Sequence, residues 1–131
     1  MTIQKDTLPD ADTTATTGQN VQHDSVIYLA FLPDSNSLTA RGRLDADHTP
    51  VVCYLPVATG SKLTAFLIPA NQPANIRFNQ LFLPDGSSDG PFGQKLEYQL
   101  PQKGIYKLYI GSSLMANDAY SGDFLLRVKV E

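Results

Sequence analysis

The sequence predicts an all-β protein, an antiparallel Greek-key β-sandwich of about eight strands. Short segments alternate between apolar and polar residues with a period of two, as strands with one buried face and one solvated face do. Turn signals rich in proline, glycine, asparagine and aspartate separate these segments at fairly even spacing. No segment has the period of a convincing amphipathic helix, and only residues 114–119 could form a helical turn.

Residues 1–22 are predicted to form a flexible polar tail, and residues 23–131 to form the sandwich. The tail has too few apolar side chains to offset the entropy that ordering would cost. Residues 1–24 carry one basic and four acidic side chains, so the net charge of −3 arises there, and the rest of the chain is neutral. Because the folded part has no basic run, nucleic-acid binding is not expected.

Five strands are predicted in the first part of the domain. The first places Ile27, Leu29 and Phe31 on one face, and a strong turn signal follows at 33–36. In the second, Gly42 falls on the apolar side, which suggests a bulge or the close approach of another backbone. The third and fourth are apolar on both faces, as expected of central strands. These strands are predicted at 26–31, 37–44, 51–57, 63–68 and 76–82.

Residues 94–130 complete the pattern with a strand, a corner, a strand, an irregular loop and a final strand. The segment 100–106 has the features of a tyrosine corner, in which the hydroxyl of Tyr106 returns to the backbone a few residues upstream. Gly104 would supply the unusual backbone angles of the bend. This motif favours a structural role for Tyr106 over a catalytic one.

No catalytic spacing is present, so the protein is not expected to be an enzyme or to need a cofactor. Cys53 is the single cysteine and lies in an apolar run, which favours a buried thiol over a nucleophile. His23 and His48 do not flank carboxylates at ligand spacing. The only glutamates, Glu97 and Glu131, are an outward strand residue and the last residue, which does not favour a glycosidase pair.

The acidic loop at 85–90 is the one candidate for a metal ion. It offers two carboxylates and several carbonyls, whereas calcium takes about six to eight oxygen ligands. A turn rich in aspartate and glycine explains the same residues. We therefore predict a turn and no metal site.

The loop between the last two strands, 111–121, is the candidate functional element. It carries Leu114, Met115 and Tyr120 where polar residues would be expected. Exposed apolar residues on a loop held by rigid strands are a common binding arrangement. Alternatively, these side chains fold back and cap the open end of the sandwich, and the sequence leaves both interpretations open.

The end of the chain carries a pattern of four segments, with two turns before them. The segments are Tyr98–Pro101, Gly104–Leu108, Asn117-Asp118-Ala119 and Phe124–Val128, and the turns are Gly60–Leu63 and Pro84-Asp85-Gly86. With this pattern the last three strands resemble the periplasmic inhibitors of goose-type lysozyme, and they are also similar to the bacterial pre-peptidase C-terminal domains. The resemblance covers about residues 26–130, and its sharpest part is the triplet 117–119. It implies a β-sandwich whose last loop enters the substrate cleft of a lysozyme.

The resemblance also implies which residues would contact the partner protein. In the family, arginines flank the Asn-Asp-Ala triplet, whereas here the flanks are Ala116 and Tyr120, which cannot pair with the carboxylates of a glycosidase cleft. Tyr120 could still stack on a sugar-binding surface or hydrogen-bond a carboxylate. The expected contact residues are Met115, Asn117, Asp118, Tyr120 and, in another loop, Asp47.

Two other hypotheses remain. The chain could be a pre-peptidase-like accessory module that binds a polysaccharide or a surface protein through a sheet face. Tyr28, Tyr54 and Tyr109 on one face would favour this hypothesis. The chain could also be a purely structural domain with a capping loop.

The sequence is compatible with more than one cellular compartment. No run is long and apolar enough to span a bilayer, and the first residues have neither a basic start nor an apolar middle. A cytoplasmic protein and an exported protein whose signal was removed would both look like this. The resemblance implies a periplasmic or secreted location, and the sequence predicts no oligomeric state.

Overall fold

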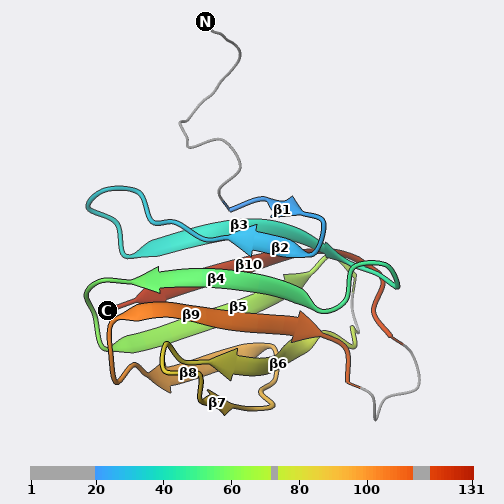
Figure 1. Cartoon of the computed structure of the whole chain (residues 1–131). Helices are drawn as coiled ribbons and strands as arrows, with labels where there is room; N and C mark the ends of the chain where they lie inside the picture. Colours follow the sequence, from blue (N-terminus) through green and yellow to red (C-terminus); the bar gives the residue numbers. More distant parts are fainter. Residues whose placement is uncertain (1–19, 72–73, 114–118) are drawn as a thin grey trace, which may run out of the picture.

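Two β-sheets face each other across an apolar core (Figure 1). The computed structural model describes residues 20–71, 74–113 and 119–131. The six-stranded sheet has the order β1 (Gln22–His23), β2 (Val26–Tyr28), β4 (Val51–Val57), β9 (Gly104–Gly111), β6 (Arg77–Phe82) and β7 (Ser88–Asp89). The four-stranded sheet has the order β3 (Ser37–Leu44), β10 (Gly122–Val130), β5 (Lys62–Pro69) and β8 (Lys95–Gln99).

This architecture confirms the predicted β-sandwich, and all eight predicted strands are present. The two additional strands, β1 and β7, have two residues each and lie at the edges of the six-stranded sheet. One neighbouring pair departs from the antiparallel prediction, because β2 and β4 run parallel. The chain leaves the six-stranded sheet after β2, forms β3 in the other sheet, and returns as β4 in the same direction.

The core is built from alternate residues of the strands. In β10 the buried side chains are those at positions 124, 126, 128 and 130, and the intervening side chains face outward. The third and fourth predicted strands are central, as expected, but only one face of each is fully buried. On the outer face of β5, Phe66 and Ile68 remain 40% and 39% exposed, because no part of the chain that the structure describes covers them fully. The largest fully buried side chains include Tyr106, Phe78, Phe124, Ile27 and Leu44.

The predicted tyrosine corner is confirmed between β8 and β9. The Tyr106 hydroxyl donates to the carbonyl of Gln102 at 2.7 Å, and the side chain is completely buried. Gly104 has a φ of 136°, and a Cβ at this position would lie 2.7 Å from Cβ of Pro84. Glycine therefore satisfies both the backbone angle and the close approach that the corner requires.

Residues that the sequence assigned to the end of the tail belong to the sandwich. The carbonyl of Asn20 accepts a hydrogen bond from the amide of Arg41 at 3.2 Å, and Oε1 of Gln22 accepts one from the amide of Arg43 at 2.7 Å. These contacts cover the free edge of β3. The predicted flexible segment before Asn20 lies outside the described residues, and the described part contains no helix that could cross a membrane.

Candidate functional site

The candidate loop connects β9 to β10 at one end of the sandwich (Figure 1). Leu114 and three of the predicted contact residues, Met115, Asn117 and Asp118, lie outside the described residues. The two ends of the loop, at 112–113 and 119–121, are described. The described part of the site therefore consists of these two ends and of the residues that hold them in place.

Tyr120 forms the support at the C-terminal end of the loop. Its ring is only 8% exposed and packs into the hydrophobic core. Its hydroxyl donates to the carbonyl of Asp123 at 2.6 Å and accepts from the amide of Ala70 at 3.1 Å. Its own amide donates to Oγ of Ser112 at 3.0 Å, which joins the two ends of the loop. Of the two interpretations that the sequence leaves open for Tyr120, its burial favours the capping one.

Burial of Tyr120 depends on Gly122, the glycine two residues after it. A Cβ at Gly122 would lie 2.9 Å from the Tyr120 hydroxyl, so a larger residue would crowd the ring. The hydroxyl satisfies one backbone donor and one backbone acceptor at the end of the core, where unpaired polar groups would be costly. The hydrogen bond between Tyr120 and Ala70 joins residues 50 positions apart, so no local sequence pattern indicates it.

Asn75 forms the support at the N-terminal end of the loop. Its Nδ2 donates to the carbonyl of Ser113 at 3.1 Å, and its Oδ1 accepts from the amide of Ser113 at 2.8 Å. One side-chain amide thus pairs with both backbone groups of a residue 38 positions away. Sequence reasoning missed Asn75, because a polar residue in a proline-flanked break looks like an ordinary turn residue.

Asp47 lies in the turn between β3 and β4, where its side chain is exposed. Asp45 organises this turn, since its Oδ1 accepts from the amide of Asp47 at 3.0 Å and lies 2.8 Å from Nδ1 of His48. The hydrogen bond from His48 is the main cause that lowers the pKa of Asp45. A Cβ at Gly111 would lie 3.7 Å from Oγ1 of Thr49, so the turn approaches the base of the loop.

An ion pair also connects the strand ends on either side of these two loops. Nη1 of Arg43, near the end of β3, lies 3.2 Å from Oδ1 of Asp123, just after the start of β10. The side chains are 55% and 70% exposed, so this pair contributes little stability by itself. It does show that the Asp47 turn and the candidate loop leave from neighbouring strand ends.

The other chemical candidates have structural roles. Cys53 is completely buried, as expected, and burial raises the pKa of its thiol. Oδ1 of Asp85 accepts from the amide of Ser87 at 2.9 Å and from its hydroxyl at 2.6 Å, an arrangement typical of an aspartate turn. Within the described ranges, no group of three or more His, Cys, Asp or Glu residues is placed to hold a metal ion.

The three tyrosines that would favour a sheet-face site do share the outer face of the six-stranded sheet. Tyr28 lies opposite Tyr54 in the β2–β4 ladder, and Tyr109 lies opposite Val52, which shares a face with Tyr54. Tyr28 and Tyr54 stack with centroids 5.4 Å apart and planes inclined by 18°, and Tyr109 packs on Phe82 at 4.9 Å. The rings therefore cover part of one another's faces.

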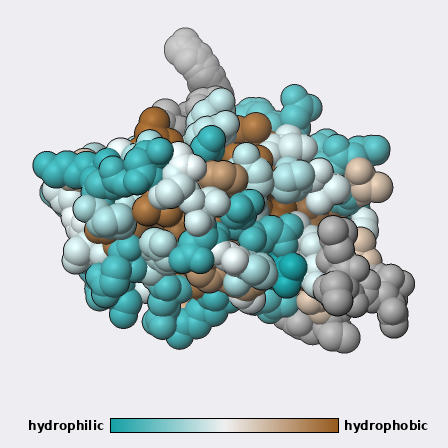
Figure 2. Space-filling view, turned by 60° about the horizontal axis from the view of Figure 1, so that its bottom comes forward, coloured by the Kyte–Doolittle hydropathy of each residue, from teal (hydrophilic) through white to brown (hydrophobic). Residues whose placement is uncertain are grey.

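The described surface that comes forward in Figure 2 is mostly hydrophilic, with small separate hydrophobic patches. Among the described residues, the exposed large apolar side chains are scattered over several segments and do not gather at the ends of the candidate loop. They are Val21, Tyr28, Leu32, Phe66, Ile68 and Ile105.

Fold and site together define a class of protein: a two-sheet β-sandwich that presents one end loop on side-chain supports. Solved structures with this fold include PliG of Aeromonas hydrophila, a periplasmic lysozyme inhibitor of g-type lysozyme, with a TM-score of 0.65 and 17% identity. The match covers 82% of this chain and 96% of that chain. The predicted resemblance to these inhibitors is thus confirmed for the fold.

A second PliG, from Salmonella Typhimurium, has a TM-score of 0.56 and 16% identity over 82% of this chain and 98% of its own. A mutant of the Escherichia coli PliG has a TM-score of 0.50 and 11% identity over 81% and 97%. No family model matches the sequence, and no curated protein matches it. At these identities the likeness establishes a shared fold.

Proposed function

We propose that this protein is a non-enzymatic, periplasmic or secreted binding protein that inhibits a lysozyme-like hydrolase by inserting the loop 111–121 into its substrate cleft. The observation that carries the proposal is the support of both ends of the loop by Asn75 and Tyr120. The shared fold with periplasmic lysozyme inhibitors supports the choice of partner.

Supported loop ends favour binding because they reduce the conformational entropy that the loop loses when a partner orders it. In this proposal Met115, Asn117 and Asp118 contact the partner, and Asp47 contacts it from the neighbouring turn. Tyr120 contributes as a buried anchor of the loop. Inhibition is competitive exclusion of substrate and requires no cofactor.

The loop lacks a cation that could pair with the acidic residues of a glycosidase cleft, since its only charged residue is Asp118. Contacts to such a cleft therefore depend on the Asn117 amide, on backbone groups and on the apolar Met115. Asp118 requires a donor on the partner, such as an arginine or a backbone amide. This composition predicts binding that depends weakly on salt.

The direct test mixes the purified protein with goose-type, chicken-type and invertebrate-type lysozymes and follows lysis of cell walls. We expect saturable inhibition of at least one enzyme, and we expect N117A/D118A to weaken it by about tenfold or more, as hot-spot truncations do. Glu97→Ala, on the outer face of β8, is the matched control and leaves inhibition unchanged. Absence of inhibition of all three at micromolar excess would overturn the proposal.

A double substitution in the loop separates binding from capping. We expect L114S/M115S to change the free energy of unfolding by less than about 0.5 kcal/mol and to weaken inhibition, because the proposal leaves these side chains outside the core. Urea denaturation measures the first quantity and the lysis assay the second. A stability loss of about 2 kcal/mol or more would show that the side chains cap the core.

The shared face of Tyr28, Tyr54 and Tyr109 supports a second candidate function, the binding of a polysaccharide. Tyr28 is 56% exposed, so one edge of this aromatic row can reach a sugar ring. Retardation in gels that contain insoluble or soluble glycans, reduced in Tyr28→Ala, would support this function. Equal mobility in the presence and absence of every glycan tested would exclude polysaccharide binding and leave the loop site as the proposed function.

A further inference from the structure

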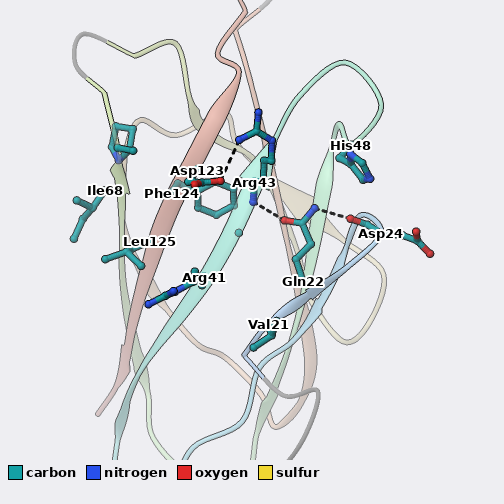
Figure 3. A pocket seen from close by; sticks show the side chains of 13 residues that line it. Val21, Gln22, Asp24, Arg41, Arg43, His48, Ile68, Asp123, Phe124 and Leu125 are labelled. Atoms are coloured by element: carbon teal, nitrogen blue, oxygen red, sulfur yellow. Dashed lines mark hydrogen bonds and ion pairs between the residues drawn. The ribbon is translucent and has the colours of Figure 1, made fainter.

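A groove runs across the outer face of the four-stranded sheet and reaches Ala70 and Asp123, beside the base of the proposed loop site. Its first part has a volume of about 630 Å³ and lies between β1, β3, β10 and the end of β5 (Figure 3). A second hollow continues it along β3, β10 and β5, and Ile68 lines both parts. We call the two together the sheet groove.

The sheet groove combines an apolar floor with two arginines. In the strand register Leu125 lies between Arg41 of β3 and Ile68 of β5, and Arg127 lies between Thr39 and Phe66. Arg41 and Arg127 are therefore diagonal neighbours on one face. Figure 3 shows Arg41, Leu125 and Ile68 side by side across the three strands.

The two arginines lack acidic partners among the described residues, whereas the other cations near the groove have them. Arg43 pairs with Asp45 and Asp123, at 3.4 and 3.2 Å. The amine of Lys129 lies 2.9 Å from Glu131, and the amine of Lys95 lies 3.7 Å from Glu97. Asp123 and Glu131, which line the groove, are thus already engaged, and Asp24 is its one lining carboxylate outside these pairs. The four basic and three acidic side chains that line the groove sum to +1.

An acidic segment of the same chain begins beside this groove. Residues 1–19 carry one basic residue, Lys5, and three acidic residues, Asp6, Asp10 and Asp12, which sum to −2. They join the described chain at Asn20, whose carbonyl accepts from the amide of Arg41. The two residues that follow Asn20 line the groove itself.

We propose that the segment 6–12 binds in the sheet groove of its own molecule. Its aspartates pair with Arg41 and Arg127, since arginine and carboxylate form strong two-point hydrogen bonds. Leu8 packs on the apolar floor of Phe66, Ile68 and Leu125. An acidic partner would then have to displace this segment before it could use the groove.

The length of the intervening chain fits this arrangement. The seven residues 13–19 carry no charge, and fully extended they span up to about 25 Å. The eight residues of β3 are about 26 Å long, so Asp12 can reach the length of the groove. A short tether holds the segment at an effective concentration of the order of millimolar, so weak pairing is sufficient.

A spin label on the segment tests the proposal in the full chain. Thr7→Cys provides a single labelling position, because Cys53 is buried and its thiol does not compete. At low salt we expect broadened amide signals at Arg41, Leu125 and Ile68. Amides of β9 and β6, in the other sheet, should be broadened much less, because they lie farther from the label.

Two variants and one mixing experiment complete the test. D6N/D10N/D12N and R41Q/R127Q, each with the label, should lose most of the broadening, while the control Lys103→Gln should keep it. Broadening that is absent, uniform over both sheets or unchanged in both variants would overturn the proposal. The last experiment mixes isotopically labelled protein that has no spin label with spin-labelled protein that has no isotope, and the signals should not be broadened. Broadening of the groove signals in this mixture would assign the contact to a second copy of the chain instead.

Discussion

Tyr106 and Tyr120 use the same chemistry at two different places in the fold. Each ring is buried in the core, and each hydroxyl donates to a backbone carbonyl, of Gln102 at 2.7 Å and of Asp123 at 2.6 Å. Tyr106 could be assigned from the sequence because its partner is four residues away in a recognisable corner. Tyr120 could not, because the other group that its hydroxyl binds, the amide of Ala70, is 50 residues away.

At the residue scale, we expect Tyr106→Phe to lower the free energy of unfolding by about 1–2 kcal/mol, because the partly buried carbonyl of Gln102 loses its donor. Urea denaturation measures the loss. Tyr28→Phe is the control, since Tyr28 is more than half exposed, and it should stay within about 0.5 kcal/mol of the parent. Equal stabilities of the two variants would contradict a tyrosine corner that stabilises the fold.

At the scale of elements, the β8–β9 corner transfers the chain from the four-stranded sheet to the six-stranded sheet. The corner brings Gly104 against Pro84, which precedes the β6–β7 turn. Two segments distant in sequence, at 84 and at 102–106, therefore meet at one end of the sandwich. The candidate loop lies after β9, at the opposite end of this strand, where Asn75 and Tyr120 support it.

We expect Gly104→Ala to destabilise the protein by about 1–3 kcal/mol, because the alanine would be strained at a φ of 136° and its Cβ would meet Pro84. Gly93→Ala is the matched control, since its added Cβ meets no atom within 4 Å. Thermal or urea unfolding of both variants measures the difference. A Gly104→Ala protein as stable as Gly93→Ala would show that the corner can relax without cost.

At the scale of the whole molecule, three carboxylates connect stability to pH: the partly exposed Asp45 and the exposed Asp85 and Glu131. The pKa of Asp45 is lowered mainly by its hydrogen bond with His48, that of Asp85 by Ser87, and that of Glu131 by Lys129. Because the pKa is lower in the folded state, the unfolded chain binds more protons as the pH falls. The contribution to stability is present above the ordinary values of 3.8 and 4.5 and is lost below them.

We therefore expect the urea midpoint to be nearly constant from about pH 7 to pH 5 and to fall as the pH drops through the folded-state pKa values. D45N/D85N should show a shallower fall, because two of the three groups no longer titrate. Unfolding curves at several pH values measure both slopes. An identical acid slope in the variant and the parent would mean that other groups control the acid transition.

Much of the fold follows from local patterns. Period-two alternation, together with two apolar runs, identified eight of the ten described strands, and the ranges 37–44 and 51–57 agree with β3 and β4. The pattern could not reveal the parallel pairing of β2 with β4, because alternation specifies faces but not neighbours. It also left the position of Tyr120 open, since a tyrosine in a loop looks the same in sequence whether its ring turns outward or caps the core.

The sequence by itself determined the class of fold, the buried faces of the strands and the tyrosine corner, since each depends on residues close together in the chain. Only the tertiary structure decided which strands are neighbours, which side chains support the candidate loop, and that Arg41 and Arg127, which have no acidic partner among the described residues, share one face. Those features depend on residues brought together across the sandwich, such as Asn75 with Ser113 and Arg41 with Leu125. These residues are far apart along the chain, so no local sequence pattern indicates that they meet.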